Sequence, residues 1–181
     1  ECPSQFMENF SWDWTVLENL TSHVQTGEKL PRSLYDKMLA AKNFQSAMAM
    51  VRQLEFGLFD MLLHTEFDSQ KDNILDLLAE VRKEVAVTKQ PDYNRFPNSF
   101  SHIFAGGYAA GYYSYKWAEV LDADAFSLFK KQGIFDQKTA FSFRENILSR
   151  GGTEHPMTLY KRFRGQEPTI DALLIRNGIK K

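Results

Sequence analysis

Residues 72–87 read DNILDLLAEVRKEVAV. The apolar side chains in this stretch recur every three or four residues with charged residues between them, which is the period of an amphipathic helix. An Asp at its start is typical of a helix N-terminus. No segment of the chain alternates apolar and polar residues with the period of two that a half-buried strand would need. The pattern therefore predicts a helix here and an all-α fold for the chain.

The segments before this helix have the same periodicity. Residues 3–24 carry apolar side chains at three- and four-residue steps, and Pro3 suits a first helical turn, where no amide donor is needed. A turn is predicted around Gly27, and residues 30–64 are expected to form one or two helices rich in Met, Leu, Ala and Phe. This half of the chain is therefore predicted to be helical as well.

Beyond residue 87 the sequence predicts a loop and then a series of helices. Residues 88–98 contain two prolines and several Asp and Asn, which favour turns through a fixed φ and local side-chain hydrogen bonds. Five helical segments are then expected, each bounded by Gly, Pro or a capping polar residue. They cover residues 102–121, 123–132, 139–149, 158–163 and 169–176.

The composition is that of an ordinary soluble globular protein. The chain has 181 residues, 43% of them hydrophobic and 25% charged, which is enough for one sizeable core and predicts one domain. The formal net charge of -1 gives no field to attract nucleic acid, and no apolar run approaches the roughly 20 residues of a membrane helix. The single cysteine, Cys2, excludes an internal disulfide and fits a reducing compartment. We therefore expect a cytoplasmic protein with no nucleic-acid or membrane partner.

The densest chemical signal is residues 100–115, FSHIFAGGYAAGYYSY, which hold four of the seven tyrosines. Tyr108, Tyr112 and Tyr115 would share one face if the segment were helical. Because a buried phenol without a partner costs about 1–3 kcal/mol, a wet cleft suits three of them better than a dry core. Gly106 and Gly107 weaken a helix and indicate a break or a close backbone approach.

These features predict a hinge or loop that presents hydrogen-bond donors to a ligand. The alternative is that the glycines are helix-packing contacts and the tyrosines are interface aromatics with wet tips, and spacing alone favours neither.

Other chemistry-bearing residues are sparse. Glu1 and Glu8 lie seven residues apart, which places both carboxylates on one side of the first predicted helix, where a carboxylate can ligate a metal but is more often a solvated charge. The four histidines have no ligand spacing, and the chain contains neither a His-Glu-x-x-His nor a G-x-S-x-G motif. Cys2 has no identifiable base partner. The short basic run at residues 161–164 has the composition of a solvated helix face. A complete zinc site is therefore not expected within this chain.

Over nearly its whole length the chain resembles the thimet oligopeptidase family of zinc peptidases. The most specific segments are ECPSQFMEN at residues 1–9, the segment 100–115, ILSRGG at 147–152 and FRG at 163–165, with a less specific stretch at 53–64. In that family a His-Glu-x-x-His helix supplies two zinc ligands and the general base, and a Glu heading a Glu-x-Pro-Ser-Gln segment is the third ligand. The resemblance therefore implies that Glu1 ligates zinc and that Glu8 lies just behind the metal ligands.

The resemblance also implies roles for the tyrosine-rich segment. In the family, its His and tyrosines contact the peptide substrate and the tetrahedral intermediate. Carried over residue by residue, substrate binding falls to His102, Tyr108, Tyr112 and Tyr115 with Gly106 and Gly107, and Tyr108 and Tyr115 have the catalytic role. The implied activity is zinc-dependent endopeptidase hydrolysis of short unfolded oligopeptides.

The missing His-Glu-x-x-His motif is a departure from the family pattern. The resemblance implies that residues 1–181 are the carboxy-terminal helical part of the catalytic domain, numbered from inside a longer protein. The missing amino-terminal part would then be a partner, and this chain alone would neither hold zinc tightly nor hydrolyse peptides. Two other interpretations are a non-catalytic helical peptide-binding module and a helical scaffold whose tyrosine face packs against a partner.

Overall fold

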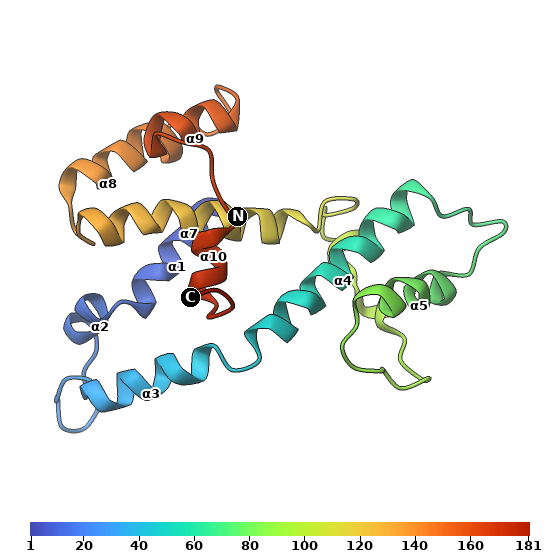
Figure 1. The fold of residues 1–181 in the computed structure, drawn as a ribbon, viewed down its shortest axis with the longest axis horizontal. Coiled ribbons are helices and arrows are strands. Elements are labelled where there is room, and N and C mark those ends of the chain that lie inside the picture. The colour runs from blue at the N-terminus through green and yellow to red at the C-terminus, as the bar shows by residue number, and fades with distance from the viewer. The chain divides into compact units, whose positions relative to one another are not determined.

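The computed structural model describes all 181 residues, Glu1–Lys181, as helices joined by turns and loops (Figure 1). It contains ten α-helices, two 3-10 turns, one π-helical turn and no strand, so the all-α prediction is confirmed. None of these helices is both long enough and apolar enough to span a bilayer. The elements are α1 Cys2–Glu8, η1 Asn9–Trp12, α2 Trp14–Leu20, α3 Arg32–Lys42, α4 Ser46–Thr65, α5 Ile74–Val85, η2 Phe96–Ser99, α6 Ser101–Phe104, α7 Ser114–Gln132, α8 Gln137–Phe143, η3 Arg144–Leu148, α9 Pro156–Arg164 and α10 Asp171–Arg176.

The chain forms two compact units. The first unit comprises residues Glu1–Phe44 and Ala118–Lys181, and the second comprises Gln45–Trp117. The first unit therefore contains α1 to α3, most of α7, and α8 to α10. The second contains α4 to α6 and the start of α7.

Phenylalanine side chains form the core of the first unit. Phe6 of α1 stacks on Phe143 of α8 with ring centroids 4.0 Å apart, and it meets Phe126 and Phe129 of α7 edge-on at 5.7 and 5.1 Å. Phe163 of α9 closes the cluster against Phe143 at 5.2 Å. Edge-on and offset aromatic pairs stabilise a core beyond the area they bury. This cluster fixes α1, α8 and α9 around α7.

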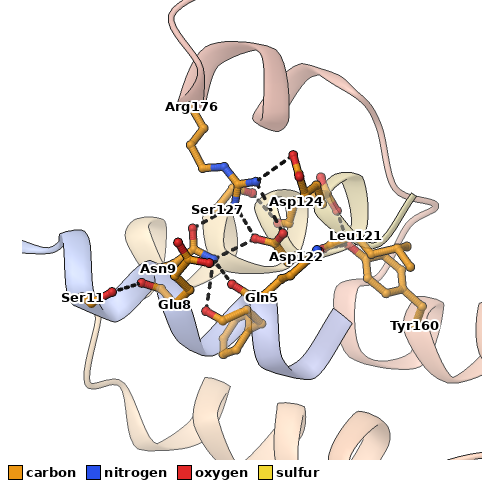
Figure 2. A network of polar contacts seen from close by, with 12 residues as sticks. Gln5, Glu8, Asn9, Ser11, Leu121, Asp122, Asp124, Ser127, Tyr160 and Arg176 are labelled. Carbon is orange, nitrogen blue, oxygen red and sulfur yellow. Dashed lines mark hydrogen bonds and ion pairs between the residues drawn. The ribbon is translucent and has the colours of Figure 1, made fainter. Parts of the chain in front are cut away.

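Two buried carboxylates on α7 connect this helix to η1, α9 and α10 by polar contacts (Figure 2). Asp122 is fully buried, accepts from Asn9 Nδ2 at 2.8 Å and pairs with the guanidinium of Arg176 on α10. Asp124, 2% exposed, accepts from the Tyr160 hydroxyl at 2.6 Å and pairs with Arg164 Nε at 3.0 Å. Because a buried charge must be paired, these contacts allow a helix with two acidic residues to run through the core.

The core of the second unit lies between α4, α5 and the segment that follows them. It is made of Phe59, Leu78, Val81, Phe100, Ile103 and Tyr112. Glu55 on α4 is 2% exposed and accepts from Arg52 Nη1 at 2.7 Å and from Arg82 Nε of α5 at 2.9 Å. This ion pair joins α4 to α5, which run side by side in Figure 1.

One predicted helix is broken in the structure, and another predicted segment forms two helices. The helix predicted over residues 3–24 divides into α1, η1 and α2, because the Asp13 side chain caps α2 by accepting from the amide of Thr15 at 2.9 Å. The segment 30–64, expected to form one or two helices, forms two, α3 and α4, separated at Gln45, whose φ of 53° is left-handed. Three or four-residue periodicity continues through both breaks, so it does not reveal them.

The elements after the 88–98 loop agree with the sequence in part. The predicted helix 102–121 is wrong, because α6 ends at Phe104 and α7 begins only at Ser114. The predicted boundary between residues 121 and 123 is also wrong, since the partnered Asp122 lies inside a continuous α7. The predictions over 139–149, 158–163 and 169–176 are confirmed as α8 with η3, α9 and α10.

Candidate functional site

The loop of residues 105–113, here called the tyrosine loop, carries most of the candidate substrate-binding residues. It follows α6 and leads into α7, so Tyr108 and Tyr112 lie outside any helix and only Tyr115 belongs to α7. The expectation that three tyrosines share one helical face is therefore wrong. The predicted break at Gly106 and Gly107 is present.

The two glycines permit the reversal at the start of this loop. A Cβ on Gly106 would lie 2.8 Å from the His102 Cα and 2.9 Å from its carbonyl oxygen, so no other residue fits without a shift of the backbone. Gly107 has a φ of +82°, which side-chain-bearing residues rarely adopt. The turn is closed by the Tyr108 amide, which donates to the His102 carbonyl at 3.0 Å.

This turn brings four side chains together in an aromatic cluster, defined here as His102, Tyr108, Tyr112 and Tyr115. The His102 ring centroid lies 6.1 Å from those of Tyr108 and Tyr115 and 5.7 Å from that of Tyr112. The Tyr108 and Tyr115 rings are 4.9 Å apart, and Tyr115 lies 5.2 Å from Tyr112. The structure thus gathers the predicted His and tyrosines without the predicted helix.

The members of the aromatic cluster differ in exposure. His102 is exposed, Tyr108 and Tyr115 are half-buried, and Tyr112 is 8% exposed within the core of the second unit. The Tyr112 hydroxyl donates to Gln53 Oε1 at 2.9 Å. Burial raises the pKa of this phenol, and the neighbouring Tyr115 adds to the effect. Tyr112 therefore packs behind the other three side chains as a protonated donor to α4.

The sequence did not indicate the groups that hold this loop in place. Asp60 of α4 is 1% exposed, and its carboxylate accepts from the amides of Ala110 and Tyr112 at 3.0 and 2.9 Å. Gln53 lies on the same helix, and its Oε1 accepts a hydrogen bond from the Tyr112 hydroxyl. The available signal was an acidic residue inside the apolar run at residues 58–63, because a charge on a buried helix face needs a partner.

The candidate metal residues belong to the first unit. Glu1 is exposed and occupies the N-cap position of α1, and Glu8 is exposed at the end of the same helix. Burial raises the pKa of the adjacent Cys2 thiol to about 11, with a further contribution from the Asp122 carboxylate. A thiol with a raised pKa is mostly protonated at neutral pH, which makes it a poor nucleophile.

The residues of this chain do not form a zinc centre by themselves. Zinc in proteins is held by three or four Cys, His or carboxylate ligands. No group of three or more such side chains is close enough to hold a metal ion. Glu1 has the chemistry of one such ligand.

Comparisons with known proteins place the chain in a family. The family model described as Peptidase family M3 matches residues 1–179. Oligopeptidase A of Escherichia coli (strain K12) is 61% identical over 181 residues, covering 99% of this chain and 27% of the relative. Oligopeptidase A of Haemophilus influenzae is 58% identical over 180 residues, covering 99% and 26%. A thimet-like oligopeptidase of Dictyostelium discoideum is 33% identical over 181 residues, covering 99% and 27%.

The chain thus spans about a quarter of the length of these relatives. The family match covers almost every residue, including Glu1 and the tyrosine loop, and it confirms the resemblance found in the sequence. The chain belongs to peptidase family M3.

Proposed function

We propose that this chain is part of a zinc-dependent endopeptidase that hydrolyses short, unfolded oligopeptides in the cytoplasm. The observation that carries the proposal is the aromatic cluster, in which two half-buried phenols and an exposed imidazole converge beside a glycine-containing turn. Hydrogen-bond donors held in this way suit a substrate whose carbonyl oxygen becomes negatively charged during the reaction. The relatives named oligopeptidases support the substrate class.

In this proposal each residue has a defined role. Glu1 is the third zinc ligand and Glu8 supports the ligands, while the other two ligands and the general base come from a His-Glu-x-x-His helix outside this chain. When bound, zinc polarises the scissile carbonyl and activates a water molecule. Tyr108 and Tyr115 donate to the carbonyl oxygen as charge develops on it.

The other candidate residues of the second unit form the peptide-binding site. His102 contacts the peptide from α6, and Tyr112 supports the cluster through its ring because its hydroxyl donates a hydrogen bond to Gln53 Oε1. Gly106 and Gly107 let the tyrosine loop close over a short peptide and exclude water. A chain that supplies one zinc ligand out of three is expected to be inactive when isolated.

We expect Glu1→Gln in the full-length protein to weaken zinc affinity by about 100-fold or more, because an amide is a far poorer ligand than a carboxylate. The test measures zinc content by mass spectrometry and chelator-sensitive cleavage of a fluorogenic peptide. Glu84→Gln is the matched control, since Glu84 is also exposed, lies on α5 and belongs to the second unit. Unchanged zinc content in Glu1→Gln contradicts the ligand assignment.

The same assay tests the wider proposal. The wild-type full-length protein is expected to cleave the peptide and to lose activity with a chelator, while isolated residues 1–181 should fold without cleaving it. Chelator-sensitive cleavage by the isolated chain would overturn the divided metal site. Peptide binding by the full-length protein with no cleavage and no metal dependence would favour the binding-module interpretation.

A further inference from the structure

A buried carboxylate on α4 holds the backbone of the tyrosine loop by hydrogen bonds. Asp60 Oδ1 accepts from the Ala110 amide at 3.0 Å and Asp60 Oδ2 accepts from the Tyr112 amide at 2.9 Å. The two donors are separated from Asp60 by 50 and 52 residues, so the contact joins a helix to a distant loop. Each carboxylate oxygen thus fixes one backbone position of the loop.

The backbone at Ala110 shows what this contact does. Ala110 has a φ of 53°, in the left-handed region that a residue with a Cβ rarely adopts. Such a conformation persists only when the surrounding contacts determine it. The hydrogen bond from the Ala110 amide to a charged, buried acceptor is such a contact, and charge-assisted bonds are about twice as strong as neutral ones.

Asp60 has a third partner that keeps it oriented. His64 Nδ1 lies 3.0 Å from Asp60 Oδ1 and 2.8 Å from the Asp60 carbonyl oxygen. Both of these oxygens can only accept, so Nδ1 carries the hydrogen and donates. The His64 side chain is 29% exposed, and it lies one helical turn beyond Asp60 on α4. With two amides and one imidazole donating to it, the Asp60 carboxylate has enough partners to remain buried.

The close approach of α4 to the loop agrees with this arrangement. Gly57, three residues before Asp60, has the Tyr113 Cα 3.7 Å from the position that its Cβ would occupy. Tyr112, whose amide Asp60 holds, packs on Tyr115 at 5.2 Å, and Tyr115 packs on Tyr108 at 4.9 Å. The positions of the Tyr108 and Tyr115 rings therefore depend on Asp60 through the contacts of Tyr112.

We propose that Asp60 is a positioning residue of the peptidase reaction, whose carboxylate fixes the tyrosine loop in the conformation that places Tyr108 and Tyr115 beside His102. This rests on the proposed function of the aromatic cluster. Asp60 does not touch the substrate. Its effect is on the geometry of the donors, where a displacement of about 1 Å is enough to slow a reaction about 100-fold.

The test is Asp60→Asn in the full-length protein. The amide has nearly the shape of the carboxylate, but its NH2 group must face one of the two backbone amides, and two donors cannot bond each other. We expect kcat for a fluorogenic peptide to fall about 10- to 100-fold while KM changes less than threefold. Amide hydrogen exchange at Ala110 and Tyr112 should become much faster, with exchange in the α5 core unchanged.

Glu55→Gln is the matched control. Glu55 is another buried carboxylate on α4, but its partners are the side chains of Arg52 and Arg82 and not the loop. This variant should lower the unfolding temperature and leave kcat and the exchange of Ala110 unchanged. An equal loss of kcat in both variants would mean that Asp60 acts only through stability, which overturns the proposal.

Two further outcomes separate this proposal from the proposed function. If the wild-type protein cleaves no peptide, the proposed function fails, and hydrogen exchange still decides whether Asp60 fixes the loop. If Asp60→Asn does not fold, amide hydrogen exchange of the wild-type protein decides. Slow exchange at Ala110 and Tyr112 supports the proposal that Asp60 fixes the loop, and exchange as fast as that of Gly107 overturns it. Wild-type kcat in a folded Asp60→Asn overturns it as well.

Discussion

Tyr115→Phe in the full-length protein is expected to lower kcat about 100- to 1000-fold, the loss seen when one donor to a developing oxyanion is removed. Phe keeps the ring contacts of Tyr115 with Tyr108 at 4.9 Å and with Tyr112 at 5.2 Å, so the loop should stay in place. The same change at Tyr108 should have an effect of similar size. The measurement is kcat on a fluorogenic peptide, with the unfolding temperature as a check on stability.

Tyr113, two residues before Tyr115, provides a control for this experiment. Tyr113 is 55% exposed and lies in the tyrosine loop but outside the aromatic cluster, so Tyr113→Phe should leave kcat within about twofold of wild type. If Tyr108→Phe and Tyr115→Phe are both as active as wild type, neither phenol stabilises the oxyanion. The peptide contact would then rest on His102 and the backbone of the loop.

Arg176→Met is expected to destabilise the protein by about 3–5 kcal/mol, because it leaves a buried carboxylate without its cation. Asp122 is fully buried and would keep only the amide of Asn9 as a near partner, at 2.8 Å. Urea denaturation monitored by circular dichroism measures the change. Adding Asp122→Asn to the variant should restore part of the loss, since the uncompensated charge is then absent.

The pH dependence of this variant has a defined sign. Burial already raises the pKa of Asp122, with Arg176 and Asn9 acting in the opposite direction, so removal of Arg176 should raise it further. The folded state then binds a proton that the unfolded state releases. The stability loss is therefore largest above the folded pKa and shrinks as the pH falls through it.

A surface ion pair gives the comparison. Arg162 pairs with Glu154 at 2.8 Å, with side chains 44% and 37% exposed, and such pairs contribute about 0–1 kcal/mol. Arg162→Met should therefore change stability by less than a third of the effect of Arg176→Met. Equal losses would show that burial of Asp122 does not set the size of the effect.

Local sequence predicted those elements whose ends carry their own signals. The helix predicted over 72–87 is α5, Ile74–Val85, and the helix predicted over 158–163 is α9, Pro156–Arg164. The N-cap of α5 is Asn73, one residue after the Asp expected to mark the start of the helix, and α9 lies between the N-cap His155 and the C-cap Gly165. Apolar period and caps agree at these places, so the sequence was sufficient.

The tyrosine loop needed information that no local pattern contains. Its glycines indicated a break, but the path of residues 108–113 depends on Asp60, which is 50 residues away from Ala110. The burial of Tyr112 depends equally on Gln53 of α4. A single sequence contains both residues but not their proximity, which is why the side chains of the site could be predicted and their arrangement could not.

The assignment of Glu1 has a different origin. Nothing in its exposure or its N-cap position distinguishes it from a solvated carboxylate, and only the family match gives the segment at residues 1–9 its meaning. No group of three or more possible metal ligands is formed around it. Its role is therefore a proposal from resemblance, and the role of Asp60 is an inference from contacts.

The contact of Arg176 with Asn9 and Asp122 also sets an order of events during synthesis. The second unit is one continuous stretch, Gln45–Trp117, so all of its own residues have been translated by the time residue 117 is added. The first unit is made of residues Glu1–Phe44 and Ala118–Lys181. The Asp122 carboxylate in it pairs with the guanidinium of Arg176, which is translated 54 residues later. On the ribosome, the part that carries the tyrosines is thus able to fold first, and the part that carries Glu1 is completed only as translation reaches α10.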